Sequence, residues 1–399
     1  VFVLSGCSEM GNVTMLRANV LRLAESAPFF EEDVEFSTPG VSQDAHSLHY
    51  SLMHSGSIRP EVVRHLVQRF SARGQVILDP FCSCGATGVE SNLQGRICFS
   101  SDVSPLAVKI AASKAGVADI TEVTLRLQQI NVRRPICLSS FDETFSPFFD
   151  IDTFRELTNL RRFLSENSDR VSRFIELLAM SLLHGQSAGY FSAYSFPQFS
   201  LSPARQKELN LRRNQVPDYR AVVPRILRKA ALVLRDGIPS CLRQLEFKNR
   251  FEISDARDLS YIPSASVDLI LSAPPQPARH VGGNYWLRSW FAGFPETSSE
   301  GRSSLGSTLE TWRESMNEVL LEFARVTRHG GRAALELPET ELKGERVVLD
   351  AEVASMVEEN LGRYWEPECV LLDRVRTTAL KNQLRERDEA KLMKRSRVL

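Results

Sequence analysis

Short apolar runs and stretches of helical spacing alternate in the first third of the chain. Two strands and two helices follow one another in the order Val76–Leu78, 87–94, 97–101 and Pro105–Ala115. A further helix is expected just before them at Arg59–Phe70, where Pro60 suits a first turn. Alternation of strands and helices is typical of a doubly wound α/β fold with a parallel sheet.

The pattern becomes mainly helical over residues 120–250, and strand signals then return. The later strands are expected at 251–254, 267–272, 332–337, 369–375 and 395–399, and the later helices at about 308–327 and 347–361. We therefore predict one α/β domain, built from residues 48–118 and 250–399 and interrupted by a helical insertion at 119–249. Residues 1–47 have weak periodicity and are predicted to be an irregular or partly helical lead-in.

Composition narrows the class of protein only a little. The chain has 399 residues, of which 43% are apolar and 25% are charged, as in ordinary soluble proteins. The net charge is zero, so any case for nucleic acid must come from local asymmetry. The seven cysteines are scattered and odd in number, which favours a reducing cytoplasm over a disulfide framework. No apolar run approaches the roughly 18–20 residues of a membrane span.

Asp79, Pro80 and Phe81 stand at the mouth of a glycine-containing turn after the first strand. Glycine lets the backbone approach a ligand closely, and ligands of doubly wound sheets lie beyond the carboxyl ends of the strands. The segment resembles the S-adenosylmethionine (SAM) loop of the N4-cytosine and N6-adenine DNA methyltransferases, usually Asp-Pro-Phe-x-Gly-Ser-Gly-Thr-Thr. The resemblance implies a Rossmann-like methyltransferase sheet with a SAM cofactor at Asp79, Pro80, Phe81, Cys82, Ser83 and Gly85.

Two positions depart from the usual loop. Ser83 stands where the family has its first glycine, and Ala86 stands where it has a threonine. The Cβ of Ser83 predicts weakened cofactor binding, because close approach of the backbone is usual there. Cys82 and Cys84 do not suggest zinc, since a lone Cys-x-Cys without a partner pair is poor metal spacing. No metal is expected.

Three acidic residues follow successive predicted strands. The resemblance implies that Asp79 faces the cationic methionyl part of SAM, that Asp102 binds the ribose hydroxyls and that Asp255 meets the adenine amine. The alternative is that these residues cap helices and turns, as aspartate commonly does. Upstream, one more segment resembles the family's cover over the methionine end of SAM, at His49, Tyr50, Gly56, Ile58, Pro60 and Glu61.

The strand at 267–272 leads into Ala273-Pro274-Pro275-Gln276, which resembles the catalytic Ser/Asp/Asn-Pro-Pro-Tyr of the same family. In that family the first residue and the following carbonyl accept hydrogen bonds from the target amine, and the aromatic residue stacks on the flipped base. Ala273 lacks the side-chain acceptor of the family's first residue, and Gln276 lacks the aromatic ring of its fourth residue. Stacking is worth roughly 1–3 kcal/mol, and a positioned hydrogen-bonding group is worth on the order of a hundredfold in rate. The motif therefore argues for weak or lost activity.

Neighbouring side chains offer possible substitutes for these lost groups. Tyr285 and Trp286 are the nearest aromatic candidates, and Ser272 and Gln276 are the nearest polar ones. The alternative is that Tyr285, Trp286 and Trp290 are core residues at helical spacing.

The insertion is locally basic. Residues 201–250 contain 12 Lys and Arg against 4 Asp and Glu, a net charge of +8. A run of aromatic residues precedes them at Tyr190, Phe191, Tyr194, Phe196 and Phe199. A basic face with aromatics is typical of nucleic-acid binding, so Arg212, Arg213, Arg225 and Arg228 are predicted to contact double-stranded DNA. The alternative is a solvated helix surface beside an aromatic core segment.

Three functions remain open. The first is methylation of an exocyclic amine of cytosine or adenine in DNA, with SAM as the methyl donor. The second is an inactive member of the same fold that binds DNA or pairs with an active methyltransferase subunit. The third is methylation of RNA or another amine.

Overall fold

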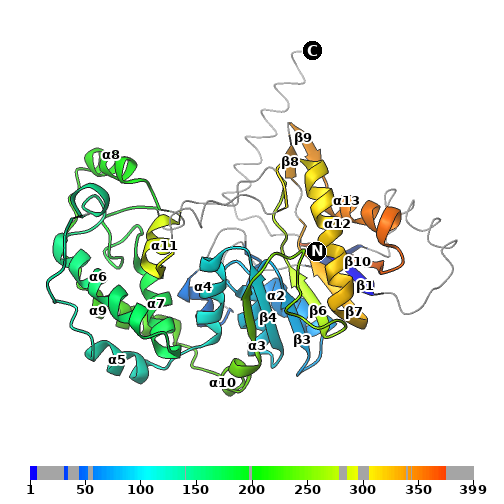
Figure 1. Cartoon of the computed structure of the whole chain (residues 1–399), viewed down its shortest axis with the longest axis horizontal. Helices are drawn as coiled ribbons and strands as arrows, with labels where there is room; N and C mark the ends of the chain where they lie inside the picture. Colours follow the sequence, from blue (N-terminus) through cyan, green and yellow to red (C-terminus); the bar gives the residue numbers. More distant parts are fainter. Residues whose placement is uncertain are drawn as a thin grey trace, which may run out of the picture.

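The computed structural model divides into a sheet-containing part and a helical part. It describes residues 1–6, 31–34, 45–52, 57–139, 141–196, 200–277, 285–294, 305–337, 340–342 and 344–373. Figure 1 shows the sheet and its helices on one side and the helical part on the other, with helices α4 (Pro105–Ala115) and α11 (Trp286–Ala292) between them. Among the described residues, no helix is both long and apolar enough to cross a membrane.

The main sheet has eight strands in the order β2-β10-β1-β7-β6-β3-β4-β5. Their bounds are β1 Phe2–Gly6, β2 Glu31–Val34, β3 Val76–Asp79, β4 Ile97–Asp102, β5 Arg250–Ile253, β6 Val267–Ser272, β7 Thr327–Leu335 and β10 Trp365–Asp373. Strands β5, β4, β3, β6 and β7 are parallel, whereas β1 runs antiparallel between β7 and β10. This is the predicted Rossmann-like, doubly wound sheet, with the antiparallel β1 added beside its parallel strands. The chain order reverses at β3, whose neighbours are β4 and β6, and ligands of such sheets bind at a reversal of this kind.

Both faces of the sheet are buried, as a doubly wound fold requires. Side chains alternate along the central strands: Ile77 and Leu269 pack on one side, and Leu78 and Ile270 on the other. Helix α2 (Pro60–Phe70) covers the first side, and α12 (Leu309–Val326) covers the second. The remaining helices of this part are α3 (Ala86–Leu93) and α13 (Leu349–Met356). A separate hairpin joins β8 (Thr340–Leu342) to β9 (Glu345–Val347).

Three helices of the insertion, α5, α6 and α9, pack against α7. The bounds of the insertion's helices are α5 Ile120–Gln128, α6 Ile151–Glu166, α7 Arg170–Leu182, α8 Pro203–Arg213, α9 Val222–Val233 and α10 Ser240–Leu245. Asp119, Asp150 and Asp169 cap the starts of α5, α6 and α7 by accepting backbone N–H groups. The apolar face of α7 belongs to one core cluster with Ile110 of α4 and Val89 of α3. The insertion therefore packs directly on the helices that follow β3 and β4.

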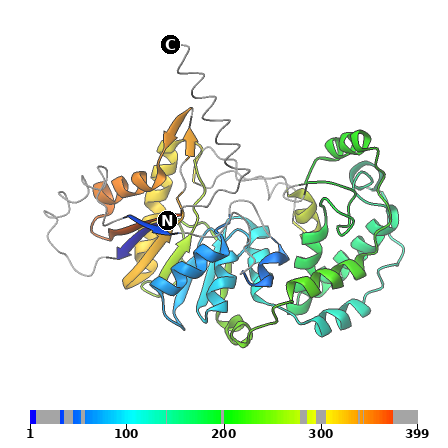
Figure 2. The same cartoon turned by 180° about the vertical axis from the view of Figure 1, so that it is seen from behind.

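The lead-in prediction is wrong at two places, because Phe2–Gly6 and Glu31–Val34 are strands. β1 is buried between β7 and β10, and Figure 2 shows it in dark blue beside strands from the last third of the chain. Its partners lie more than 300 positions away, so local periodicity could not reveal the pairing. The strand expected at 395–399 lies outside the described residues.

Candidate functional site

The turn after β3 has an unusual backbone. Gly85 N–H donates to the carbonyl of Cys82 over 2.7 Å, which closes a four-residue turn. Its second residue, Ser83, has φ of 46°, in the left-handed region that favours glycine. Gly85 has φ of 73° and precedes α3, and a Cβ there would lie 2.7 Å from Cα of Ala111. The turn therefore keeps a glycine-like shape at the position where the resembled family has its first glycine.

Asp102, at the end of β4, fixes the backbone of this turn. Its carboxylate accepts the N–H of Ser83 over 3.1 Å and the N–H of Ser104 over 2.9 Å. Cys82 N–H also donates to the carbonyl of Ser101 over 3.0 Å. Burial raises the pKa of Asp102. The second acid thus shapes the turn, and its predicted role toward a ribose stays a prediction.

Asp79 lies at the centre of the site and is only 3% exposed. Its carboxylate accepts the Ser272 hydroxyl over 2.5 Å and the N–H of Phe81 over 3.3 Å, and the Thr87 side chain also hydrogen-bonds to it. Burial raises the pKa of Asp79 to about 6, although these hydrogen bonds oppose the rise. Asp79 therefore joins β3 to β6 and α3, and its role toward the methionyl part of SAM stays a prediction.

The predicted catalytic segment begins beside Asp79. Ser272 ends β6, is fully buried and donates its hydroxyl to Asp79. Ala273 packs against the cluster under α2, and the carbonyl of Pro275 accepts the indole N–H of Trp312 over 2.8 Å. Residues Ala273–Gln276 are thus held between α2 and α12 at the carboxyl end of β6.

The residues that might replace the missing catalytic groups differ in burial and in their contacts. The Ser272 hydroxyl is committed to Asp79 and has no exposed surface. Trp286 donates to the carbonyl of Leu201 over 2.8 Å and packs against Phe145 and Phe148, so it is a core residue. Trp290 belongs to the same aromatic cluster. Gln276 and Tyr285, both only partly buried, are the candidates that keep accessible surface.

Asp255 follows β5, as predicted, but it is engaged by Arg257. The guanidinium donates to both carboxylate oxygens, over 3.0 and 2.8 Å. Burial alone would raise the pKa of Asp255, but the hydrogen bonds and charge of Arg257 outweigh it, so the pKa is lowered. A contact from this carboxylate to an adenine amine would need Arg257 to share it.

The segment before the turn contacts the turn, and its role as a cover over the methionine end of SAM stays a prediction. Ser57 Oγ lies 3.2 Å from Ser83 Oγ and 2.9 Å from Cys84 Sγ. Upstream, His49 Nε2 lies 3.0 Å from the buried Glu90 carboxylate of α3. Burial lowers the pKa of His49. Of the six residues quoted for this segment, Gly56 lies outside the described residues.

Two lysines that sequence reasoning missed hold this segment. Lys114 of α4 donates to the carbonyl of Leu52 over 2.5 Å, and Lys229 of α9 donates to the carbonyl of Tyr50 over 2.6 Å. Burial lowers the pKa of both, to about 8 for Lys229. The sequence could have singled out Lys114, because it is a charged residue on the largely apolar helix 105–115. No sequence feature singles out Lys229.

Arg288 is a further residue that the sequence did not single out. It lies on α11 and is buried, and burial lowers its pKa to about 10. Tyr285, Tyr190 and Cys84 lie near its guanidinium, so Arg288 sits where the turn after β3, the insertion and α11 approach one another. Its guanidinium lies 5.5 Å from the ring centre of Tyr285.

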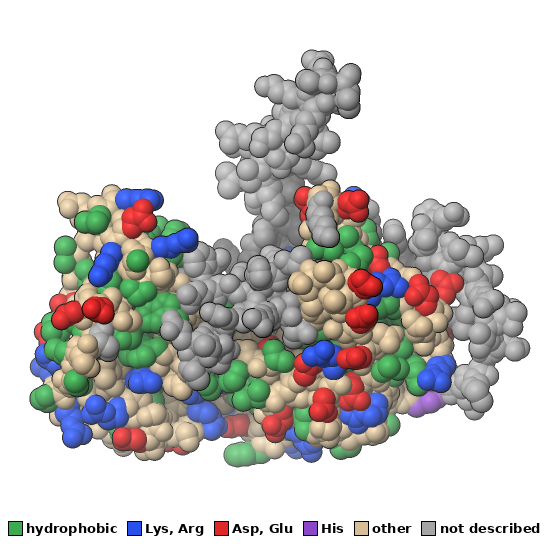
Figure 3. Space-filling model, turned by 45° about the horizontal axis from the view of Figure 1, so that its top comes forward, with side chains coloured by type: hydrophobic (Ala, Val, Ile, Leu, Met, Phe, Trp, Pro, Cys, Tyr) green, Lys and Arg blue, Asp and Glu red, His purple; other side chains and the backbone are tan. Residues whose placement is uncertain are grey.

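The four arginines predicted to contact DNA have different surroundings. Arg212 pairs with Glu208 on the exposed side of α8. Arg213 stacks over Tyr194, with Cζ 3.7 Å from the ring centre, and Arg225 donates to the carbonyl of Ala188 over 3.1 Å. Arg228 is exposed on α9. Figure 3 shows Lys and Arg side chains gathered at the upper left, over α8. DNA contact by these residues remains a prediction.

The aromatic run of the insertion is partly core and partly displayed. Phe191 is fully buried, Tyr190 and Tyr194 are partly buried, and Phe196 is 39% exposed. Phe199 lies outside the described residues. The core alternative therefore holds for Phe191, and contact of the more exposed members with nucleic acid stays a prediction.

Comparison with known proteins adds little to this geometry. No protein-family model matches the chain, and no curated protein matches it in sequence. Among solved structures, it is similar to two structures of the rRNA methyltransferase AviRa from Streptomyces viridochromogenes. The identities are 12% and 11% with TM-scores of 0.27, over 75% and 77% of this chain and 90% and 94% of those chains. Similarity this remote carries no argument about substrate.

Proposed function

We propose that this protein binds SAM at the carboxyl ends of β3 and β4 and methylates an exocyclic amine of cytosine or adenine in DNA. The observation that carries the proposal is the hydrogen bond between Ser272 and Asp79. It joins the first residue of the cofactor motif to the residue directly before the catalytic motif, across 193 positions of sequence. This contact supports the proposal that the two motifs resembling one family belong to one site.

The residues present fit such a cofactor in chemistry. Bound SAM supplies a cationic sulfonium that carries an electrophilic methyl group. Carboxylates at the ends of β3, β4 and β5 suit a ligand that has cationic groups, ribose hydroxyls and an adenine amine. The glycine-like turn at Ser83 presents backbone to the ligand, as the resembled loop does. The carbonyl of Pro274 is the acceptor that would orient the target amine.

A second candidate is an inactive relative that binds DNA or pairs with an active subunit. It is favoured by the loss of the acceptor at Ala273 and the ring at Gln276. The burial of Ser272 and Trp286 removes two of the groups that might replace them. The third candidate, methylation of RNA or another amine, uses the same cofactor site with a different pocket.

One experiment separates the candidates. Purified full-length protein is incubated with SAM labelled in its methyl group and with duplex DNA, single-stranded DNA, RNA or a small amine. We expect slow transfer to DNA, and transfer at least about tenfold faster by the Ala273→Ser/Gln276→Tyr variant, since both lost interactions are restored. Transfer by that variant alone supports the inactive relative, and transfer to RNA alone supports the third candidate. Absence of SAM binding by both proteins overturns the proposal.

A further inference from the structure

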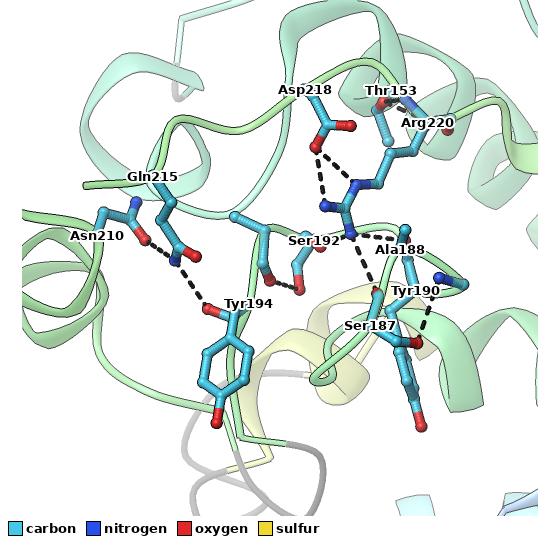
Figure 4. A network of polar contacts seen from close by, with 12 residues as sticks. Thr153, Ser187, Ala188, Tyr190, Ser192, Tyr194, Asn210, Gln215, Asp218 and Arg220 are labelled. Atoms are coloured by element: carbon cyan, nitrogen blue, oxygen red, sulfur yellow. Dashed lines mark hydrogen bonds and ion pairs between the residues drawn. The ribbon is translucent and has the colours of Figure 1, made fainter. Parts of the chain in front are cut away.

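Residues 187–192, between α7 and α8, are held from one side by Arg220. Arg220 is buried, pairs with Asp218 and donates to the carbonyls of Ser187 over 3.3 Å and of Tyr190 over 3.2 Å, and also to the carbonyl of Ser192. Figure 4 shows these contacts converging on one guanidinium. A buried cation with several carbonyl partners fixes a main-chain path that has no ladder of its own.

A second set of contacts holds the main chain at Tyr194. Gln206 of α8 and Gln215 donate to the Tyr194 carbonyl over 2.9 and 3.1 Å, and both also donate to Asn210. Gln215 reaches back to this point because Asn214, with φ of 47°, ends α8 in a left-handed turn. The loop and α8 therefore form one unit.

This unit displays two tyrosine rings. Figure 4 shows the rings of Tyr190 and Tyr194 extending to the same side of the loop, away from Arg220 and Gln215. Between them in sequence, Phe191 is fully buried and anchors the loop. Tyr190 lies close over Gly185, where a Cβ would come within 2.4 Å of its ring.

One face of the Tyr194 ring carries a stacked cation. Arg213, in the last turn of α8, has its guanidinium carbon 3.7 Å from the ring centre. The exposed surface of α8 bears four cations, Arg205, Lys207, Arg212 and Arg213, against one acid, Glu208. An aromatic ring on a hydrogen-bonded stretch of main chain, within a cationic surface, suits a ligand with a flat π face and phosphates.

We propose that Tyr194, backed by Arg213, is a stacking platform for one unpaired base of a nucleic acid. The base stacks on the ring, and the cations of α8 contact the neighbouring phosphates. The platform belongs to the insertion and not to the segment that follows β6, so we assign it a nucleotide other than the one to be methylated. The platform depends on the proposed function in one respect only, namely that the substrate is a nucleic acid.

The test measures binding of a labelled 12-residue oligothymidylate by the full chain without SAM. Its comparison strand has the same length and charge but abasic sugars throughout. Wild type is expected to bind the strand with bases roughly 5- to 100-fold more tightly, as stacking of one base provides. Tyr194→Ala is expected to lose most of this preference, whereas Tyr194→Phe keeps the ring and most of the preference.

The abasic strand also controls for folding, because Tyr194→Ala should bind it as wild type does. Equal binding of both strands by wild type overturns the platform, and so does an equal loss for both strands in Tyr194→Ala. Oligouridylate serves as a second probe, and a base preference on either sugar supports the platform. Because no SAM is present, a protein that neither binds SAM nor transfers methyl groups refutes the proposed function without affecting this result.

Discussion

Replacing Asp79 with asparagine should change how stability depends on pH. The amide side chain would keep an acceptor for Ser272 and Phe81 and would carry no charge. In the folded wild type, burial raises the pKa of Asp79 from 3.8 to about 6. Each pKa unit corresponds to about 1.4 kcal/mol, so ionising this buried carboxyl costs about 3 kcal/mol of folding stability. The folded state binds the proton more tightly than the unfolded state does.

The direction follows from that difference. The contribution of Asp79 is fully present below about pH 4 and is lost as the pH rises through about 6. The difference in free energy of unfolding, wild type minus Asp79→Asn, should therefore fall by about 3 kcal/mol between about pH 4 and about pH 7. The other titratable groups contribute equally in both proteins, so their contributions cancel in this difference. Urea unfolding of both proteins at several pH values measures this difference. A flat difference, or one that rises with pH, would refute the assignment of a buried, protonatable Asp79.

Three further predictions concern the turn and the insertion. In urea unfolding, Ser83→Gly should have a free energy of unfolding about 0.5–1 kcal/mol higher than that of Ser83→Ala. Both variants lose the hydroxyl, but only glycine relieves the strain of the left-handed backbone. Equal stabilities of the two variants would contradict this strain. Gly85→Ala should lose about 2–4 kcal/mol of stability, since its Cβ meets Ala111 at 2.7 Å and its φ is positive, and a melting point like that of wild type would contradict it. Arg228→Gln should release about one counterion fewer on binding duplex DNA, which lowers the slope of log binding constant against log salt concentration by about one. An unchanged slope would show that Arg228 does not contact the DNA.

Much of the α/β part could be predicted from local sequence. The helix Pro105–Ala115 and the strand Val267–Ser272 have the predicted bounds, because a proline after the Ser104 cap marks the helix and an apolar run, interrupted only by Asp268, marks the strand. β1 was missed because four apolar residues at the chain start are ambiguous until β7 and β10 flank them. Pairing across such a distance leaves no local signal.

The site was predictable as a set of positions and less so as a set of contacts. The resemblance placed Asp79, Ser83 and Asp102 together, and the structure joins Ser83 to Asp102 through a backbone hydrogen bond. The resemblance could not indicate that Ser272 donates a hydrogen bond to Asp79, or that Arg257 pairs with the Asp255 carboxylate. Such side-chain pairing depends on tertiary geometry. The same holds for Arg213, whose stacking on Tyr194 joins the end of α8 to the loop that precedes this helix.

Equilibrium binding of SAM by the purified full chain tests most directly whether the turn after β3 is a cofactor site. Titration calorimetry on wild type should give saturable, one-to-one binding that S-adenosylhomocysteine displaces. Asp102→Asn loses one of its two backbone contacts and should bind at least about tenfold more weakly, as loss of a charge-assisted hydrogen bond predicts. The absence of saturable binding by wild type, or equal affinity in Asp102→Asn, would contradict a SAM site at this turn.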